Sequence, residues 1–172
     1  MTRLRAVHPH QVVRSIFEID VPLLHGAGIE VIAFDIDNTL GPMGCREVDD
    51  DTLRYLKELG NEFALCLATN SRRDVTGIAD PIGAKVVQPV DGVPRKPHVS
   101  FFKAIAFTMA TPPRQTAMVG DKLMHDTTPA ATYGMHTVLV NPLGEDLFLE
   151  KVALRRPRED WHLRRLGLAR PA

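Results

Sequence analysis

Short apolar runs that alternate with helical segments constrain the fold of this chain more than any other feature. Residues 31–34 (VIAF) form a continuous apolar run with β-branched side chains, and the run stops abruptly at Asp35. Similar runs occupy residues 63–68, 116–119 and 137–140, and a weaker one occupies residues 84–87. Continuous runs of this length are typical of strands that are buried on both faces of a parallel sheet.

Apolar residues recur at helical spacing in the segments between these runs. Those segments are residues 50–59, 72–82, 98–109 and 126–134. A strand, a helix and a second parallel strand form a right-handed crossover, which lays the helix on one face of the sheet. The sequence therefore predicts the α/β class, with a doubly wound, three-layer, Rossmann-like parallel sheet.

Length and composition are those of one globular domain, which we expect to span residues 1–172. Of the 172 residues, 44% are hydrophobic and 24% are charged, which excludes a disordered or collagen-like chain. The 21 basic and 21 acidic residues cancel, so the net charge gives no reason to expect a nucleic-acid partner. No signal peptide or membrane-spanning run is evident, and two cysteines suit a reducing compartment. We therefore expect a cytoplasmic protein.

Polar residues that directly follow the apolar runs are the candidate site. Because the carboxyl ends of parallel strands meet at one edge of a sheet, we expect these side chains to share one crevice. Lys96, in a Pro-rich loop just before a helical segment, is expected to join them. The other members are Asp35, Asp37 and Thr39 after the first run, Thr69 and Asn70 after the second, and Asp121 and Asp126 after the run at 116–119.

Several aspartates in one crevice indicate a cation site. Crowded carboxylates repel one another unless a cation neutralises them, and hard oxygen ligands favour Mg²⁺. Lys96, Thr69 and Asn70 are expected to bind the oxygens of a phosphate, helped by the N-terminus of a helix after Asn70. An aspartate beside Mg²⁺ can attack phosphorus while a second carboxylate transfers protons, and Asp35 and Asp37 suit these two roles.

Four motifs in this chain resemble, in the same order, those of the haloacid dehalogenase-like (HAD) phosphatases. They are Asp35-Ile36-Asp37-Asn38-Thr39, Thr69-Asn70-Ser71, Lys96-Pro97, and Gly120-Asp121 followed by Asp126. The resemblance implies that Asp35 is the nucleophile, that Asp37 is the general acid/base, and that Thr69 and Lys96 bind phosphate. It also implies that Mg²⁺ is held by Asp35, Asp121, Asp126 and the main-chain carbonyl of Asp37. Thr39 and Asn70, within these motifs, are expected to contact substrate.

The resemblance extends to one branch of that family. Residues 12–17 (VVRSIF) and the Gly-Asp loop resemble the small subfamily IIIA, which includes phosphatidylglycerophosphatases of bacteria and mitochondria. It covers residues from about 9 to 150 and implies that phosphatidylglycerophosphate is dephosphorylated to phosphatidylglycerol. Two departures are Ser71, where a second Asn is expected in the branch, and His125, which is inserted into the acidic loop.

The spacing of the motifs leaves no room for a large cap domain over the site. Residues 40–61 and 72–95 span about 22 and about 24 residues, enough for a crossover helix, a short strand and loops. We therefore expect a site that is open to water. Such a site suits a bulky phosphate carrier that covers the pocket itself, such as a lipid head group.

A basic C-terminal segment begins at about residue 151. It holds seven Lys and Arg residues against two acidic ones, with Trp161, Leu163, Leu166 and Leu168 interleaved. On one interpretation it lies on the inner face of an anionic membrane, where each basic residue contributes about 1 kcal/mol. On the other interpretation it is a solvated tail.

Two alternatives to a lipid phosphatase stay open at this point. The chain can be a HAD phosphatase of a soluble sugar phosphate, nucleotide or phosphoprotein, which an open site equally permits. It can also be a regulatory module that binds phosphate without turnover, although Asp35, Asp37 and Lys96 together argue against that. Asp49 is expected to cap the helix that follows it, and His125 and Cys45 receive no assigned role.

Overall fold

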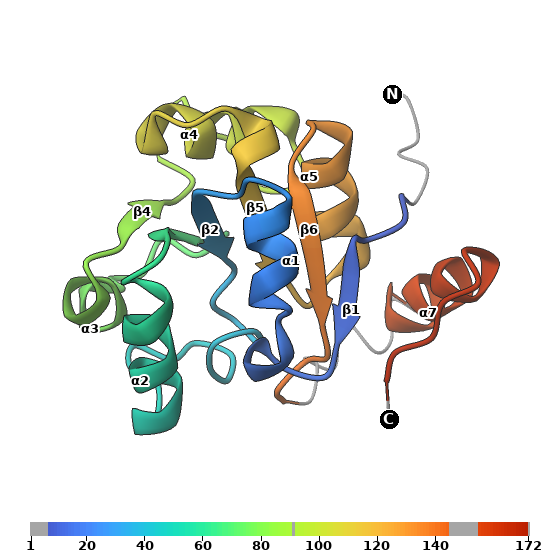
Figure 1. Cartoon of the computed structure of the whole chain (residues 1–172), viewed down its shortest axis with the longest axis horizontal. Coiled ribbons are helices and arrows are strands. Elements are labelled where there is room, and N and C mark those ends of the chain that lie inside the picture. The colour runs from blue at the N-terminus through green and yellow to red at the C-terminus, as the bar shows by residue number, and fades with distance from the viewer. Residues whose placement is uncertain (1–6, 91, 145–154, 172) are drawn as a thin grey trace.

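One parallel sheet organises the protein, as the sequence predicts. The computed structural model describes residues 7–90, 92–144 and 155–171. Within these residues six strands pair in the order β1-β6-β5-β2-β3-β4, and every pairing is parallel (Figure 1). The strands are β1 (Gln11–Val13), β2 (Val31–Phe34), β3 (Ala64–Ala68), β4 (Lys85–Val87), β5 (Thr116–Gly120) and β6 (His136–Val140).

Helices cover both faces of this sheet, which confirms the predicted three-layer α/β fold. The α-helices are α1 (Val21–Gly26), α2 (Asp50–Leu59), α3 (Thr76–Ala79), α4 (Val99–Met109), α5 (Thr128–Thr132) and α7 (Arg155–Arg165). Short 3-10 helices occupy Ile16–Glu18, Asp80–Ile82 and Pro113–Gln115, and a π-helical turn occupies Leu123–Thr127. None of the described helices is long and apolar enough to cross a membrane.

The two faces of the sheet are sorted by the alternation of side chains along each strand. On β2, Ile32 and Phe34 pack in one apolar cluster with residues of α1, α2 and α3. Val31 and Ala33 belong to the opposite cluster, which contains α4 and α5. All four side chains are buried, and full burial of a large apolar side chain contributes about 1.5–3 kcal/mol. The continuous run at 31–34 is therefore explained by a central strand with helices on both sides.

The connections between motifs hold no cap domain in the described residues. The first connection consists of a loop and α2, and the carboxylate of Asp49 accepts a hydrogen bond from the Thr52 amide at 2.7 Å, which confirms the predicted cap. The second connection differs from the single helix predicted over 72–82. Its helical part begins only at Thr76, because hydroxyl and carboxylate side chains in the preceding turns, including Asp74, accept the backbone N–H groups there.

Strand β1 and helix α1 were not predicted from the sequence. β1 has three residues and pairs in register with the end of β6, with Gln11 opposite Val138. α1 has six residues, too few for a helical period to be visible. Both elements extend the sheet and its cover on the side of β6, so they are stabilised by tertiary contacts more than by local sequence.

The basic C-terminal segment forms a helix whose described residues include one buried apolar side chain. Leu163 is 1% exposed and packs with Leu123 and Leu139, whereas Trp161 on the same helix is 52% exposed. In Figure 1, α7 lies beside β1 at the edge of the sheet. Leu163 therefore faces the core rather than a membrane surface. Lys151 lies outside the described residues, as do the side chains of Arg155, Arg156 and Arg158.

Two stacked histidines join β6 to the segment before β1. The rings of His10 and His136 lie 4.2 Å apart between centroids, and the Thr137 amide donates to Nδ1 of His10 at 3.1 Å. Burial first, and then the neighbouring His10, together lower the pKa of His136 to about 4. The lowered pKa values mean that the folded structure favours the neutral form of both rings. Protonation of either ring therefore destabilises this packing.

We expect this pair to make the fold sensitive to mild acid. A histidine whose pKa is lower in the folded state stabilises the fold above its unfolded pKa of about 6.5, and the contribution is lost as the pH falls toward 4. From pH 7 to pH 5, His136 should account for a loss of about 1–2 kcal/mol in the free energy of unfolding. Urea denaturation at both pH values measures this. Between the two pH values, His136→Gln should lose less free energy of unfolding than wild type does. The control His162→Gln, on α7, should lose as much as wild type. Equal losses in all three proteins would contradict the assignment of this acid sensitivity to His136.

Candidate active site

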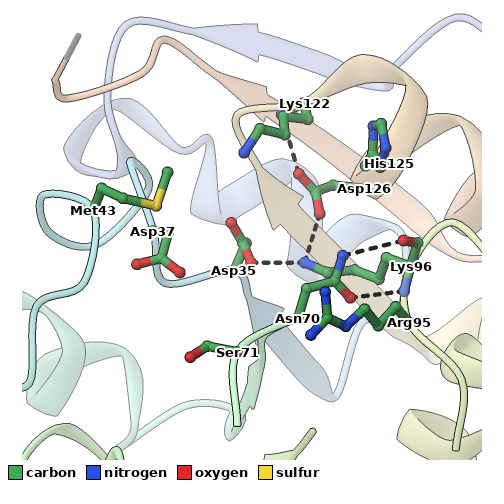
Figure 2. A pocket seen from close by; sticks show the side chains of 10 residues that line it. All are labelled: Asp35, Asp37, Met43, Asn70, Ser71, Arg95, Lys96, Lys122, His125 and Asp126. Carbon is green, nitrogen blue, oxygen red and sulfur yellow. Dashed lines mark hydrogen bonds and ion pairs between the residues drawn. The ribbon is translucent and has the colours of Figure 1, made fainter. Parts of the chain in front are cut away.

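A cavity of about 470 Å³ lies at the edge where the carboxyl ends of the central strands meet. Asp35 follows β2, Asn70 follows β3, and Asp126 comes from the turn after β5, while Lys96 comes from the loop before α4. Figure 2 shows these side chains pointing toward one another. The lining residues are Asp35, Asp37, Met43, Asn70, Ser71, Arg95, Lys96, Lys122, His125 and Asp126. The structure thus brings most of the predicted site residues into one place.

Lys96 lies at the centre of the buried charges. Its Nζ donates to Oδ1 of Asp35 at 2.7 Å and to Oδ1 of Asp126 at 2.6 Å, and its side chain is 2% exposed. Burial disfavours the ammonium, but Asp126 and Asp35 outweigh that effect and raise the pKa of Lys96 above its usual value. The lysine is therefore a fixed positive charge against the two carboxylates.

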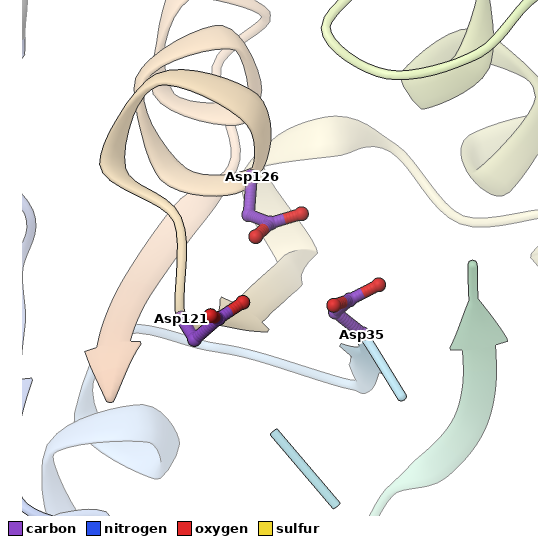
Figure 3. A group of neighbouring side chains, drawn as sticks. All are labelled: Asp35, Asp121 and Asp126. Carbon is purple, nitrogen blue, oxygen red and sulfur yellow. The ribbon is translucent and has the colours of Figure 1, made fainter. Parts of the chain in front are cut away.

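Three buried carboxylates face a common point. One oxygen from each of Asp35, Asp121 and Asp126 lies within 4.8 Å of the others, and Figure 3 shows the three groups converging. The pKa of Asp35 is raised to about 7, mainly by burial; Lys96 opposes the rise, whereas Asp126 and Asp121 add to it. When all three carboxylates are ionised, they exceed the one ammonium by two negative charges in a buried place, which a divalent cation would neutralise. The oxygen donors suit Mg²⁺, so these residues could hold that ion.

Gly120 allows the acidic loop, which we define as residues 121–127, to fold tightly against the end of β5. A Cβ atom at Gly120 would lie 2.6 Å from Cβ, Cγ and Oδ2 of Asp126. The Asp126 carboxylate also accepts a hydrogen bond from the Lys122 amide at 3.1 Å, within the π-helical turn. The wide turn returns Asp126 to the strand end, and only the absence of a side chain at position 120 lets it approach so closely.

The predicted phosphate cradle is arranged differently from the expectation. Asn70 donates to the Lys96 carbonyl at 3.1 Å and accepts from the Lys96 amide at 2.7 Å, so its amide holds the lysine loop in place. Thr69 is fully buried, accepts a hydrogen bond from the Ser71 amide at 3.1 Å, and does not line the cavity. Ser71 lines the cavity instead. Thr39 is also buried outside the cavity lining, and its hydroxyl has no hydrogen-bond partner among the described residues.

The helix N-terminus that was expected after Asn70 is absent from that position. In the described chain the next helix, α3, begins at Thr76 and has four residues. The hydroxyls of Thr69 and Ser71 accept the amides of Ser71 and Arg73, and these turns replace the first helical turn. No helix dipole therefore points at the cavity from residue 70.

Asp37 is held apart from the charged group around Lys96. Its carboxylate accepts two hydrogen bonds from Arg73, at 2.8 and 2.9 Å, and one from the Gly44 amide at 2.8 Å. Arg73 also donates to the Cys45 carbonyl at 2.9 Å, so it ties Asp37 to the loop that contains Met43. Figure 2 shows the side chain of Met43 beside Asp37. The side chain of Asp37 still lines the cavity, but it does not join the three carboxylates that converge.

Several site residues were not selected from the sequence. Arg95 and Lys122 line the cavity. They are sequence neighbours of Lys96 and Asp121, and only this position could have indicated them from the sequence. His125 also lines it, which the sequence left open. Arg73 pairs with a residue 36 positions earlier, and no local pattern indicates such a contact. Met43 lies in a loop with no motif of its own, so only the tertiary structure places it.

The comparisons with known proteins agree with this geometry. Residues 93–142 match a family model described as HAD-hydrolase-like. The chain is 25% identical over 138 residues to "Probable phosphatase YqeG" of Bacillus subtilis, a match that covers 78% of this chain and 77% of that protein. These matches support a hydrolase that acts on phosphate esters and is similar to the HAD-like hydrolases. The distant phosphatase homologue does not extend this conclusion to a particular substrate.

Solved structures share the fold of this chain. A HAD-like family hydrolase from Porphyromonas gingivalis has a TM-score of 0.53 at 14% identity, covering 75% of this chain and 98% of that one. A HAD family enzyme from Bacteroides thetaiotaomicron has a TM-score of 0.54 at 13% identity, covering 71% and 98%. The latter structure is a complex with magnesium and inorganic phosphate. At these identities the likeness shows the fold.

Gly120→Ala should disturb the acidic loop. The added Cβ would lie 2.6 Å from Asp126, so we expect a loss of about 1–3 kcal/mol in the free energy of unfolding and a large loss of phosphatase activity. Urea denaturation and release of phosphate from an aryl phosphate measure the two effects. Gly26→Ala is the control, because nothing lies within 4 Å of its added Cβ. Wild-type activity in Gly120→Ala would show that Asp126 does not need its observed position.

Proposed function

We propose that this chain is a Mg²⁺-dependent phosphatase of HAD subfamily IIIA, that Asp35 carries the phosphoryl group covalently, and that phosphatidylglycerophosphate is the substrate. The observation that carries the proposal is the buried group of Asp35, Asp121 and Asp126 around Lys96, which has two net negative charges. A bound Mg²⁺ would neutralise those charges and stabilise the phosphate oxygens. The site residues then supply the remaining chemistry.

Asp35 is the proposed nucleophile. Its Oδ1 accepts from Lys96, which leaves Oδ2 for attack on phosphorus. In the first step the bond from Asp35 Oδ2 to phosphorus forms and the ester bond to the leaving oxygen breaks. In the second step water attacks the phosphorus, inorganic phosphate leaves, and the Asp35 carboxylate is restored. Lys96 remains charged throughout and offsets the charge of the phosphoryl oxygens.

Asp37 is the proposed general acid and base of these steps. It gives a proton to the leaving oxygen and takes one from the attacking water. To do so its carboxylate must leave the bidentate contact with Arg73, since both of its oxygens accept hydrogen bonds from that guanidinium. The proposed mechanism therefore includes a movement of Asp37, together with the loop to which Arg73 ties it.

The choice of a lipid substrate rests on the open cavity and on the resemblance to phosphatidylglycerophosphatases. In the described residues no cap covers the cavity, and Arg95 and Lys122 add positive side chains to its lining. A lipid head group with a terminal phosphate would cover such a site itself. The same features equally support a soluble phosphate ester, which is the second candidate. A module that binds phosphate without turnover is the third candidate. Such a module would not need the buried carboxylate of Asp35.

Phosphate release is the direct test of this proposal. In mixed micelles with Mg²⁺, we expect phosphatidylglycerophosphate to be hydrolysed with a higher kcat/KM than an aryl phosphate. EDTA should abolish both activities, and Asp35→Asn should lower them by about 10³-fold or more, because the nucleophile is lost. Hydrolysis of the aryl phosphate alone would retain the mechanism and replace the lipid by a soluble substrate. Full activity of Asp35→Asn would sink the assignment of the nucleophile.

Asp37→Asn should separate the two steps of the reaction. An aryl leaving group needs no proton, so the first step should persist while the second slows by about 10²–10⁴-fold without its base. We therefore expect a rapid burst of about one aryl alcohol per enzyme, followed by slow turnover, and no burst with an alkyl phosphate. Stopped-flow absorbance measures the burst. Asp51→Asn, outside the cavity lining, is the control and should turn over like wild type; equal slowing on both substrates without a burst would contradict the role of Asp37.

A further inference from the structure

The last residues of the chain contact the acidic loop that carries two of the proposed cation ligands. We call residues 159–171 the C-terminal arm. Arg170 donates from Nη2 to the Asp121 carbonyl at 2.9 Å and from Nη1 to the Val140 carbonyl at 2.8 Å. Asp121 is the first residue after β5, and Val140 is the last residue of β6. One guanidinium therefore joins the carboxyl ends of two neighbouring strands at the edge that holds the site.

A second contact reaches the middle of the acidic loop. Oε1 of Glu159 accepts a hydrogen bond from the Met124 amide at 3.2 Å, and Glu159 is 4% exposed. Arg170 in turn lies 3.6 Å from Oε2 of Glu159 and 3.6 Å from Oδ1 of Asp160. The arm thus holds the loop at its first residue and at its fourth through one connected set of charged side chains.

Apolar packing and a further hydrogen bond seat the arm beside the loop. Leu163 packs with Leu123 of the acidic loop and with Leu139 of β6. Near the end of the chain, the Asn141 side chain donates to the Pro171 carbonyl at 2.9 Å. These contacts explain why the arm stays in place, but they do not by themselves require a guanidinium at position 170.

We propose that Arg170 is a positioning residue for the cation ligand Asp121, and that the C-terminal arm fixes the acidic loop in the geometry that binds the divalent cation. The inference rests on the proposed function. Asp35, Asp121 and Asp126 repel one another before a cation binds, and this repulsion favours an opened loop. Arg170 opposes that opening, because it holds the main chain of Asp121 against the end of β6. Residues that orient metal ligands in this way commonly contribute about 10–100-fold to metal affinity.

Isothermal titration of the full-length protein with MgCl₂ tests the proposal. Arg170→Met keeps the apolar stem and removes both donors, so we expect its dissociation constant for Mg²⁺ to rise by about tenfold or more. At saturating Mg²⁺ its kcat on an aryl phosphate should return to within about twofold of wild type, because the ligands themselves are intact. Arg165→Met is the matched control. Arg165 lies over the Trp161 ring on α7, and its substitution should leave Mg²⁺ affinity unchanged.

The outcomes separate this inference from the proposed function. If wild type binds Mg²⁺ and hydrolyses phosphate esters, and Arg170→Met binds Mg²⁺ equally well, the positioning role is wrong while the proposed function stands. If wild type binds no Mg²⁺, both fail. If Arg170→Met weakens Mg²⁺ binding and loses kcat even at saturating Mg²⁺, its role is structural and the inference also fails.

Two variants of Glu159 test the role of the C-terminal arm if Arg170→Met does not fold. Glu159→Gln keeps an oxygen that can accept from the Met124 amide, whereas Glu159→Ala removes it. We expect Glu159→Ala to weaken Mg²⁺ binding by several-fold more than Glu159→Gln does, with equal circular dichroism spectra for the two folded proteins. Equal Mg²⁺ affinities for this pair would overturn the role of the arm.

Discussion

The buried contact of Lys96 with Asp35 and Asp126 is the interaction on which the candidate site depends. A lysine with 2% of its side chain exposed is tolerated because two carboxylates stand at hydrogen-bond distance. The same carboxylates, with Asp121, exceed its charge when all are ionised, and this excess is what supports the proposed divalent cation. The side-chain amide of Asn70 holds the Lys96 loop in place, because it accepts from the Lys96 N–H and donates to the Lys96 carbonyl.

Close approach of the backbone is the second requirement of the site. The acidic loop returns Asp126 to the end of β5 through a π-helical turn, and Gly120 leaves the space that this return needs. Arg170 joins the same loop from the far end of the chain. The geometry of the ligands is therefore set jointly by a local turn, by a missing side chain and by a distant arm, and the proposed charge chemistry depends on all three.

Asp37 and Arg73 show how the resting geometry differs from a reactive one. The carboxylate of Asp37 lines the cavity but is engaged by Arg73 and by the Gly44 amide, at distances of 2.8–2.9 Å. A proton-transfer role for Asp37 consequently requires that the loop around Met43 rearrange when substrate enters.

The sequence by itself determined the parallel α/β sheet and the residues that follow its central strands. The continuous apolar run at 31–34 predicts a strand buried on both faces, and the register of parallel strands then places Asp35 and Asp121 at one edge. Only the tertiary structure decided the pairing of Asp37 with Arg73, the position of Thr69 behind the cavity, and the contact of Arg170 with the acidic loop. The physical reason is that strand periodicity is a local property, whereas a salt bridge or a bond to a main-chain carbonyl depends on which distant segments the packed fold brings together.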